Sequence, residues 1–544
     1  MAFNPSGKTS EFHYLCEMFL DGTTLRFADE DLSIQQSAAT GHFYEGRLPA
    51  GGSLVRSLGT FLEAKETVTT FEVNLDNRDG RIEDILTRYT VANREVDIWV
   101  GEGVHKDNYS KVFPGVVAHP AGVQWNEQVA SFNVIDKRIK SRKTLPEEKF
   151  TDTNYPHLED KSLNQPIPIL YGNFSSNQPG PVGVRAYCVN TQTQQFKIAG
   201  HRLKSIDKIT KNAIRMTVAQ TSNICLTDAS FNLTGVNYNS TDDIMEVHCA
   251  GLATANQTLI EKPLDVVKHI YTAYMGLTGS DLNGTAFNYA NAETGVEVVR
   301  SVITEEASNE LLIGELLQEA AFDMRFVEGQ YDPKARNLDQ DSNRTSFREE
   351  DILVRSGQEE FADFSVSRDP DRIYLNKARA QYNYSNIDAR YLSAYTFQLT
   401  AAVQQASATV ERPMNFNWYY QQSDVEPQVQ RHVATFSTEP QQIEMTVTAR
   451  ALMKNLADQV DLTYNVFDDR PMQIRKMDLD LAAMSVRISA WDFLQLGSGR
   501  WASSSNVAYS AASYNERASS GYWSNEVGFA TSTDLDSLSV SKWF

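Results

Sequence analysis

Cysteine is scarce in this sequence and forms no close pair. The 544 residues contain four cysteines, Cys16, Cys188, Cys225 and Cys249, at wide spacings and without a Cys-x-x-Cys motif. This usage favours reduced, structural cysteines in a cytosolic protein. His248 precedes Cys249, but a zinc site that also used Cys225 lacks a fourth ligand at any standard spacing. We therefore expect neither a disulfide framework nor a zinc site.

Long apolar runs are also absent. No run approaches the roughly 18 residues that a transmembrane helix needs, and the N-terminal residues lack the apolar core of a signal peptide. We therefore expect no membrane segment and synthesis in the cytoplasm.

Motifs of the common enzyme classes are missing. The chain has no Gly-x-Ser-x-Gly, no His-Glu-x-x-His and no Walker loop. Glycoside hydrolysis needs two carboxylates that face each other across a sugar, which the adjacent acids at 305–306, 349–350 and 359–360 do not do. The nine histidines are scattered singly, without a partner at a catalytic spacing. We therefore predict that the protein is not an enzyme and has no catalytic, cofactor-binding or metal-ligating residues and no cofactor.

Basic charge is in deficit. The chain has 50 Lys and Arg against 70 Asp and Glu, a formal net charge of −20. Tight binding of a nucleic-acid backbone needs a dense Lys/Arg surface, so the charge argues against that task, although solubility alone explains the same acidity. Hydrophobic residues at 41% and charged residues at 22% are ordinary globular values. The length predicts about three to five domains.

The most informative segment that is present covers residues 71–82. Its first half alternates apolar and polar residues, the pattern of a strand with one solvated face. Residues 76–80 end the strand with short polar side chains and with Gly80, which is free to adopt a positive φ. An EF-hand calcium loop with Gly80 in its sixth position would begin at Leu75 and end at Leu86, which breaks the pattern at both ends. A structural turn is predicted instead.

Three segments resemble one known family. A strand that ends in Leu-Asp-Asn-Arg-Asp-Gly-Arg at 75–81 resembles the first domain of the tail-hub or baseplate-hub (tail-tip) proteins of tailed bacteriophages. Ile167–Gly172 is similar to the Pro-Ile-Val-Tyr-Gly strand that follows this domain in many such proteins. Residues 456–462 lie where related proteins often have a Pro-Gly-Asp-Val-Val turn, with Ala457 in place of the glycine. None of these motifs is catalytic, so the resemblance implies an architecture and transfers no active site.

The order of patterns predicts a mainly β, multi-domain fold. Two barrel-like antiparallel β domains bracket an inserted β-rich domain and a helix-containing α/β domain. The expected divisions are 1–140 for the first barrel-like hub domain, 141–163 for a linker, 164–260 for the inserted β-rich domain, 261–371 for the α/β domain, 372–497 for the second barrel-like hub domain, and 498–544 for a C-terminal arm.

Helices are predicted at three places. One opens at Pro263, since proline suits a first helical position. A second follows Thr304 as its cap, with Glu305 and Glu306 in the first turn. A short third helix covers Pro427 to Phe436. Polar residues 329–351 predict an exposed loop.

The C-terminal arm, residues 498–544, is rich in serine but carries many aromatic residues. Aromatic side chains along a polar arm commonly anchor it to a neighbouring surface. That surface is either a partner or the arm's own chain, and both alternatives stay open.

The resemblance also implies a function. In phage hubs, two barrel-like domains per chain lie side by side, so that a trimer presents six quasi-equivalent units to a sixfold tail tube. The chain is therefore expected to be a virion tail-tip protein made in the host bacterial cytoplasm: a homotrimeric baseplate hub that closes or continues the tube, adapts it to a threefold tip and forms part of the DNA-ejection channel. No clear repeat links residues 11–135 and 375–490, so the duplication rests on the resemblance alone.

The implied partners are further copies of the chain, a distal tail or tail tube protein above, and tail fibre, spike or tip proteins below. A tape measure protein or DNA would pass through the lumen without specific binding. Two alternatives stay open: a hexameric distal-tail ring protein and a tail-associated cell-wall hydrolase.

Overall fold

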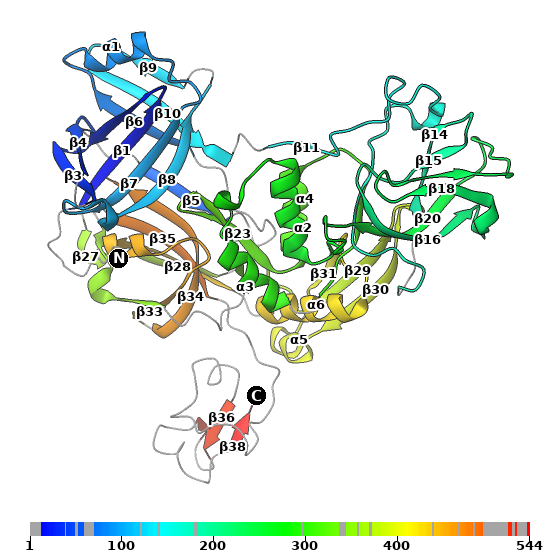
Figure 1. The fold of residues 1–544 in the computed structure, drawn as a ribbon. Coiled ribbons are helices and arrows are strands. Elements are labelled where there is room, and N and C mark those ends of the chain that lie inside the picture. Colours follow the sequence, from blue (N-terminus) through cyan, green and yellow to red (C-terminus); the bar gives the residue numbers. More distant parts are fainter. Residues whose placement is uncertain are drawn as a thin grey trace.

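The computed structural model describes residues 12–37, 40–48, 53–58, 70–119, 122–138, 142–178, 183–294, 297–336, 344–355, 358–368, 373–437, 440–465, 467–481 and 485–492, and short strands at 521–524, 528–529 and 541–543. The fold is mainly β and divides into several sheets, with helices at its centre (Figure 1). Within these ranges, no helix is long and apolar enough to span a membrane.

The N-terminal part forms a nine-stranded sheet, here called the first β unit. Its strand order is β3-β4-β2-β1-β7-β8-β10-β6, and β9 pairs with β10. In β6 the predicted alternation is confirmed, because Phe71, Val73 and Leu75 are buried. All pairs are antiparallel except β2 with β4, which departs from the predicted antiparallel arrangement. The bounds are Phe12–Leu20 (β1), Thr23–Ala28 (β2), Leu32–Ser37 (β3), Thr40–Gly46 (β4), Thr70–Asp76 (β6), Glu95–Glu102 (β7), Tyr109–Val117 (β8), Val123–Trp125 (β9) and Val129–Asp136 (β10).

A seven-stranded sheet, the second β unit, lies beside the first (Figure 1). Its order is β25-β33-β34-β35-β32-β28, and β5 pairs with β34. Strands β25 and β28 fall in the segment that the sequence analysis assigned to the α/β domain; they join this sheet because their partners are β33 and β32. The β25–β33 pair is parallel. The bounds are Ser53–Ser57 (β5), Thr345–Arg348 (β25), Phe364–Arg368 (β28), Gln441–Thr448 (β32), Gln459–Tyr464 (β33), Phe467–Asp480 (β34) and Ser485–Asp492 (β35), with a separate hairpin of Val354–Arg355 (β26) and Gln358–Ala362 (β27).

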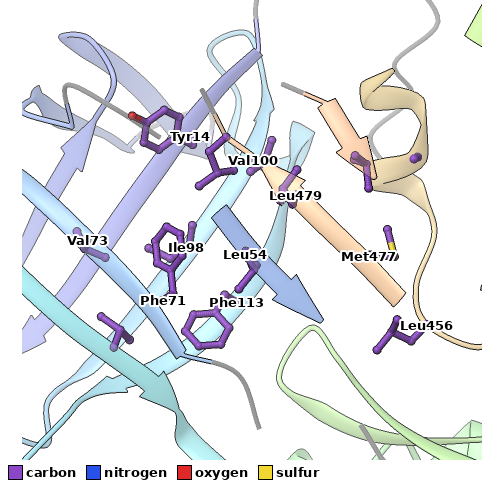
Figure 2. Close-up of a cluster of buried hydrophobic side chains, with 14 of the residues drawn as sticks. Tyr14, Leu54, Phe71, Val73, Ile98, Val100, Phe113, Leu456, Met477 and Leu479 are labelled. Atoms are coloured by element: carbon purple, nitrogen blue, oxygen red, sulfur yellow. The ribbon is translucent and has the colours of Figure 1, made fainter. Parts of the chain in front are cut away.

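The two β units share one hydrophobic core. Buried side chains of the first unit, such as Ile98 and Phe113, belong to the same cluster as Leu456 and Leu479 of the second. Figure 2 shows these residues gathered around Leu54 of β5. Burying an aliphatic or aromatic side chain of this size contributes about 1.5–3 kcal/mol. The shared core therefore resists separation of the units.

The inserted part, roughly residues 164–260, contains two four-stranded sheets with the orders β13-β20-β16-β17 and β14-β15-β19-β18. They enclose a core that includes Phe196, Phe231 and Val247. The strands β14 and β20 lie in this part of the chain, for which β-rich structure was predicted. The bounds are Val184–Arg185 (β13), Tyr187–Asn190 (β14), Gln195–Lys197 (β15), Leu203–Lys211 (β16), Ile214–Arg215 (β17), Thr221–Cys225 (β18), Ser230–Leu233 (β19) and Met245–Leu252 (β20).

Short strand pairs connect the insertion and the expected linker to the helices. β12 pairs with β21, and β11, inside the predicted linker 141–163, pairs with β22. The bounds are Thr144–Leu145 (β11), Ile169–Tyr171 (β12), Ser301–Ile303 (β21) and Ala307–Ser308 (β22).

The central helices confirm one predicted start and correct another. Helix α2, Pro263–His269, opens at Pro263 as predicted and continues into a π-helical turn to Tyr274. Helix α4, Asn309–Glu319, is capped by Ser308, whose hydroxyl accepts a hydrogen bond from the Leu311 amide at 3.2 Å. The predicted start at Thr304 is wrong, because residues 307–308 are extended and pair with β11. Helix α3, Gly284–Thr294, was not predicted.

The hairpin of β23, Phe322–Val327, and β24, Gln330–Ala335, follows α4. The exposed loop predicted over 329–351 is contradicted by β24 and β25; residues 337–343 lie outside the described ranges. β24 is a strand because it pairs with β23 along its whole length.

Residues 373–436 form a further layer on the helices. Strands β29, Lys377–Ser385, β30, Arg390–Gln398, and β31, Glu411–Asn415, make a three-stranded sheet. Helix α6, Gln422–Phe436, begins before the predicted Pro427 and contains that proline; helix α5 is Thr400–Ala406. The sequence predicts this segment to be part of the second barrel-like domain, but its buried residues pack in the same core as α2 and α4. Helix α6 covers β29 and β30, so this sheet needs no partner from the second β unit.

Of the C-terminal arm, the described residues form a small sheet of β36, Gly521–Ser524, β37, Gly528–Phe529, and β38, Ser541–Trp543. The rest of the arm lies outside the described residues.

The turn after β6 has the predicted conformation. Gly80 has φ 71°, and helix α1, Arg81–Arg88, begins directly after it. Asn77 is buried and caps the helix, because its Oδ1 accepts hydrogen bonds from the amides of Ile82 and Glu83, both at 3.1 Å. Asp79 accepts a hydrogen bond from Arg47 at 2.8 Å. This acidic turn is thus used in capping and in ion pairs.

Replacing Gly80 by valine should lower the free energy of unfolding by roughly 1–3 kcal/mol, because a β-branched residue is strained at positive φ. A Cβ at Gly80 meets no atom within 4 Å, so crowding does not contribute. Gly80→Asn is the matched control, since asparagine tolerates the left-handed region. Urea unfolding that gives equal losses for both variants would contradict this explanation.

Candidate functional site: the joint between the two β units

The residues singled out from the sequence do not converge on a catalytic centre. Glu305 and Glu306 are exposed, as are Glu349 and Glu350, and the side chains at 359–360 lie outside the described set. Cys16, Cys188 and Cys249 are buried free thiols, as expected of structural cysteines, and Cys225 is half-buried. Within the described ranges, no group of three or more His, Cys, Asp or Glu side chains is arranged to hold a metal ion.

Two histidines do lie beside carboxylates, which spacing did not indicate. His13 Nδ1 is 3.2 Å from Asp29 Oδ2, and His248 Nε2 is 3.5 Å from Glu246 Oε1. Strand pairing in the first case, and proximity on β20 in the second, bring these groups together.

A cavity of about 370 Å³ lies between α4, β31 and α6. Its deepest acidic group is Glu319, whose oxygens accept hydrogen bonds from the amides of Asn417 at 2.6 Å and Trp418 at 3.0 Å. Burial raises the pKa of Glu319 to about 8, against the opposing effect of these amides. The burial of Glu319 could have been predicted from the sequence, because Glu319 follows Leu312 and Leu316 at helical spacing and so lies on the apolar face of α4.

The closest link between the β units is strand β5. β34 pairs with β33 through residues 467–473 and with β5 through residues 476–480, while β35 occupies its opposite edge. β33 and β5 therefore pair with the same edge of β34, one after the other along its length. Leu54 of β5 is 1% exposed, and the amide of Leu58 donates a hydrogen bond to the Arg475 carbonyl at 2.8 Å. A segment of the first half of the chain thus completes the sheet of the last part.

The β23–β24 hairpin lies against both β units. Arg56, on β5, donates a hydrogen bond to the Phe326 carbonyl at 2.9 Å. The Arg138 guanidinium, just after β10, lies 4.9 Å from the centre of the Phe326 ring. Arg325 donates a hydrogen bond to Asp458 of the second unit at 2.5 Å. The hairpin therefore ties the helical part to the joint.

A buried ion network fixes the hairpin to β34. Asp323, at 0% exposure, accepts hydrogen bonds from Arg336 Nε at 3.0 Å and Arg475 Nη1 at 2.8 Å. Burial alone disfavours the Asp323 carboxylate, but the two guanidinium groups outweigh it and lower its pKa. Arg475 is itself buried on β34. Such a network is costly to break, because each guanidinium group supplies a charge-assisted hydrogen bond to a fully buried carboxylate.

The turn before β33 has an unusual residue. Ala457 is fully buried with φ 63°, in the left-handed region that glycine adopts more readily than alanine. Its amide donates a hydrogen bond to the Ile474 carbonyl at 2.8 Å. The left-handed conformation costs alanine about 1–2 kcal/mol, so the surrounding joint must hold the turn in place.

Comparisons with known proteins give structural neighbours only. No protein-family model and no curated protein matches the sequence. The chain is similar to the 43 kDa tail protein of prophage MuSo2 from Shewanella oneidensis, with 10% identity and a TM-score of 0.40 over 85% of this chain and 98% of that chain. It is also similar to prophage tail protein gp18 from Listeria monocytogenes, with 8% identity and a TM-score of 0.38 over 85% and 94% of the two chains. Its structural neighbours include phage tail and baseplate proteins. The similarities are distant.

Replacing Arg475 by methionine should lower the free energy of unfolding by about 1.5–3 kcal/mol, because the buried Asp323 would lose one of its two charge-assisted hydrogen bonds and keep the one from Arg336. The matched control is Arg487→Met, which removes an exposed ion pair with Glu444 and should cost at most about 1 kcal/mol. Chemical denaturation measures both. Similar losses in the two variants would show that the buried network does not stabilise the joint.

Glu319 should make stability depend on pH. Its folded-state pKa of about 8 lies above the ordinary value of 4.5, so the folded state holds the proton more tightly. The resulting stabilisation is full below pH 4.5 and is lost as the pH rises towards 8. The stability of the wild type relative to Glu319→Gln should therefore fall between pH 5 and pH 8 in urea unfolding. The exposed Glu305→Gln is the control, and a difference for Glu319→Gln that stays constant with pH would contradict the assignment.

Proposed function

We propose that this chain is a structural subunit of a phage tail tip, a hub that assembles as a homotrimeric ring. The observation that carries the proposal is the joint, in which β5 and a shared core hold two β units side by side. A cyclic assembly of three such chains surrounds a lumen with six β units, which suits contact with a sixfold tube.

The segments that resemble phage hubs support this proposal. Gly80 has the positive φ expected for the turn after β6. Ile167–Gly172 contains the buried strand β12 and ends in Gly172 at φ 80°, where a Cβ would lie 2.0 Å from the Val299 carbonyl oxygen. In both segments, the backbone conformation therefore explains why a glycine stands at the position that carries the resemblance.

The proposed partners are a tail tube or distal tail protein on one side and fibre, spike or tip proteins on the other. Three copies carry a formal charge of −60, three times −20. An acidic or neutral lumen would let DNA or a tape measure protein pass without retention, since phosphate affinity comes from Lys and Arg. The proposed location is the virion tail tip.

The carboxylates favour this structural role over the hydrolase alternative. Glu315 and Glu319 are four residues apart on one helix, and Glu319 is held by backbone amides. They do not form the opposed pair across a sugar that glycoside hydrolysis uses.

The assembly state tests the proposal. Mass photometry of the purified chain should show a species of about 183 kDa, three times 61.1 kDa. Class averages of stained particles should show threefold rings with six peripheral densities. A hexamer would favour the distal-tail ring protein, and clearing of peptidoglycan in a zymogram would favour the hydrolase. A monomer at every soluble concentration would contradict the homotrimer.

A further inference from the structure

The cavity beside α4 has the size of a ligand site and is not used by the joint. Its volume of about 370 Å³ falls within the range of small-molecule pockets, roughly 300–1,000 Å³. Helix α4 forms one wall, α6 another, and β31 the rim, where Asn415 is exposed. The cavity is therefore accessible from the surface.

The walls are largely apolar. Ile373, Leu375, Phe416 and Phe436 are each at most 7% exposed and line the cavity, and Met414 adds a flexible thioether at the rim. Such walls favour an aliphatic group over a strongly hydrated one.

The polar end of the cavity carries acids. Glu315 and Glu319 lie four residues apart on the same face of α4, and burial raises the pKa of both carboxyl groups. From α6, His432 faces the cavity, but burial lowers its pKa to about 3, so it is neutral. Arg412 lines the β31 side. The amides of Asn417 and Trp418 orient Glu319 without supplying a full positive charge.

We infer that this cavity binds an ammonium or guanidinium group on an aliphatic stem. The stem would lie against the apolar walls, and the cation would pair with Glu315 and Glu319. Two sources share this chemistry: a free polyamine, and a lysine or arginine side chain of a partner protein. The inference does not rest on the proposed function, since it concerns a surface away from the joint.

Binding should release a proton. The proton leaves the Glu319 carboxyl for the buffer as the ligand cation takes its place beside the carboxylate, so charge balances without another reactant. Calorimetry at pH 7 in buffers of different ionisation enthalpy measures this release directly.

The test uses the full chain and matched probes. n-Pentylamine should bind at least about tenfold more tightly than 1-pentanol, which has the same stem without the charge. Glu315→Gln should weaken pentylamine binding by at least about tenfold, while Glu305→Gln, an exposed site outside the cavity, should leave it unchanged. Met414→Trp should abolish binding by filling the cavity without altering its charge. Circular dichroism and thermal unfolding confirm that each variant is folded.

Two further probes distinguish the sources. Cadaverine represents a free polyamine, and Nα-acetyl-lysine amide represents a side chain carried by a polypeptide. Tighter binding of cadaverine supports a polyamine site, and tighter binding of the blocked lysine supports a partner side chain. Equal affinity for pentylamine and pentanol, undiminished binding by Glu315→Gln, or no binding of any amine would overturn the inference.

Discussion

Strand β5 pairs with β34, and most of the architecture depends on this contact. Five residues from the first half of the chain add to a sheet whose other strands begin at Thr345. Each β unit has a broad apolar face. The pairing of β5 with β34 brings these two faces together in one core, so that each face is buried by the other. The β23–β24 hairpin then attaches the helices to β34 through the contact of Asp323 with Arg475.

Local patterns predicted much of the fold correctly. Strand β6, the positive φ of Gly80 and the start of α2 at Pro263 were all readable, because each depends on residues that are close in sequence. Alternation, glycine freedom and proline's fixed φ act over a few residues and need no tertiary information.

The errors came from contacts between distant segments. The start of α4 moved to Asn309 because β22 pairs with β11, more than 160 positions earlier in the chain. Residues 373–436 were predicted to belong to the second barrel-like domain. In the structure they pack with the central helices, because α6 covers their sheet. β5 is short and polar at several positions, so nothing local identifies its partner. The sequence shows Glu319 only as an acidic residue at an apolar position of α4. Its hydrogen bonds could not be predicted, because the amides that donate them lie about 100 residues later in the chain.

Hydrogen exchange followed by mass spectrometry tests the central claim, that β5 makes the two β units one cooperative body. Amides of β5, β34 and β8 should exchange through a common opening, with closely similar protection and the same response to low denaturant. The β17 edge of the insertion should exchange separately and serves as the internal reference. If the β5 amides exchanged much faster than those of β34 under native conditions, the strand would not hold the units together and the account would be contradicted.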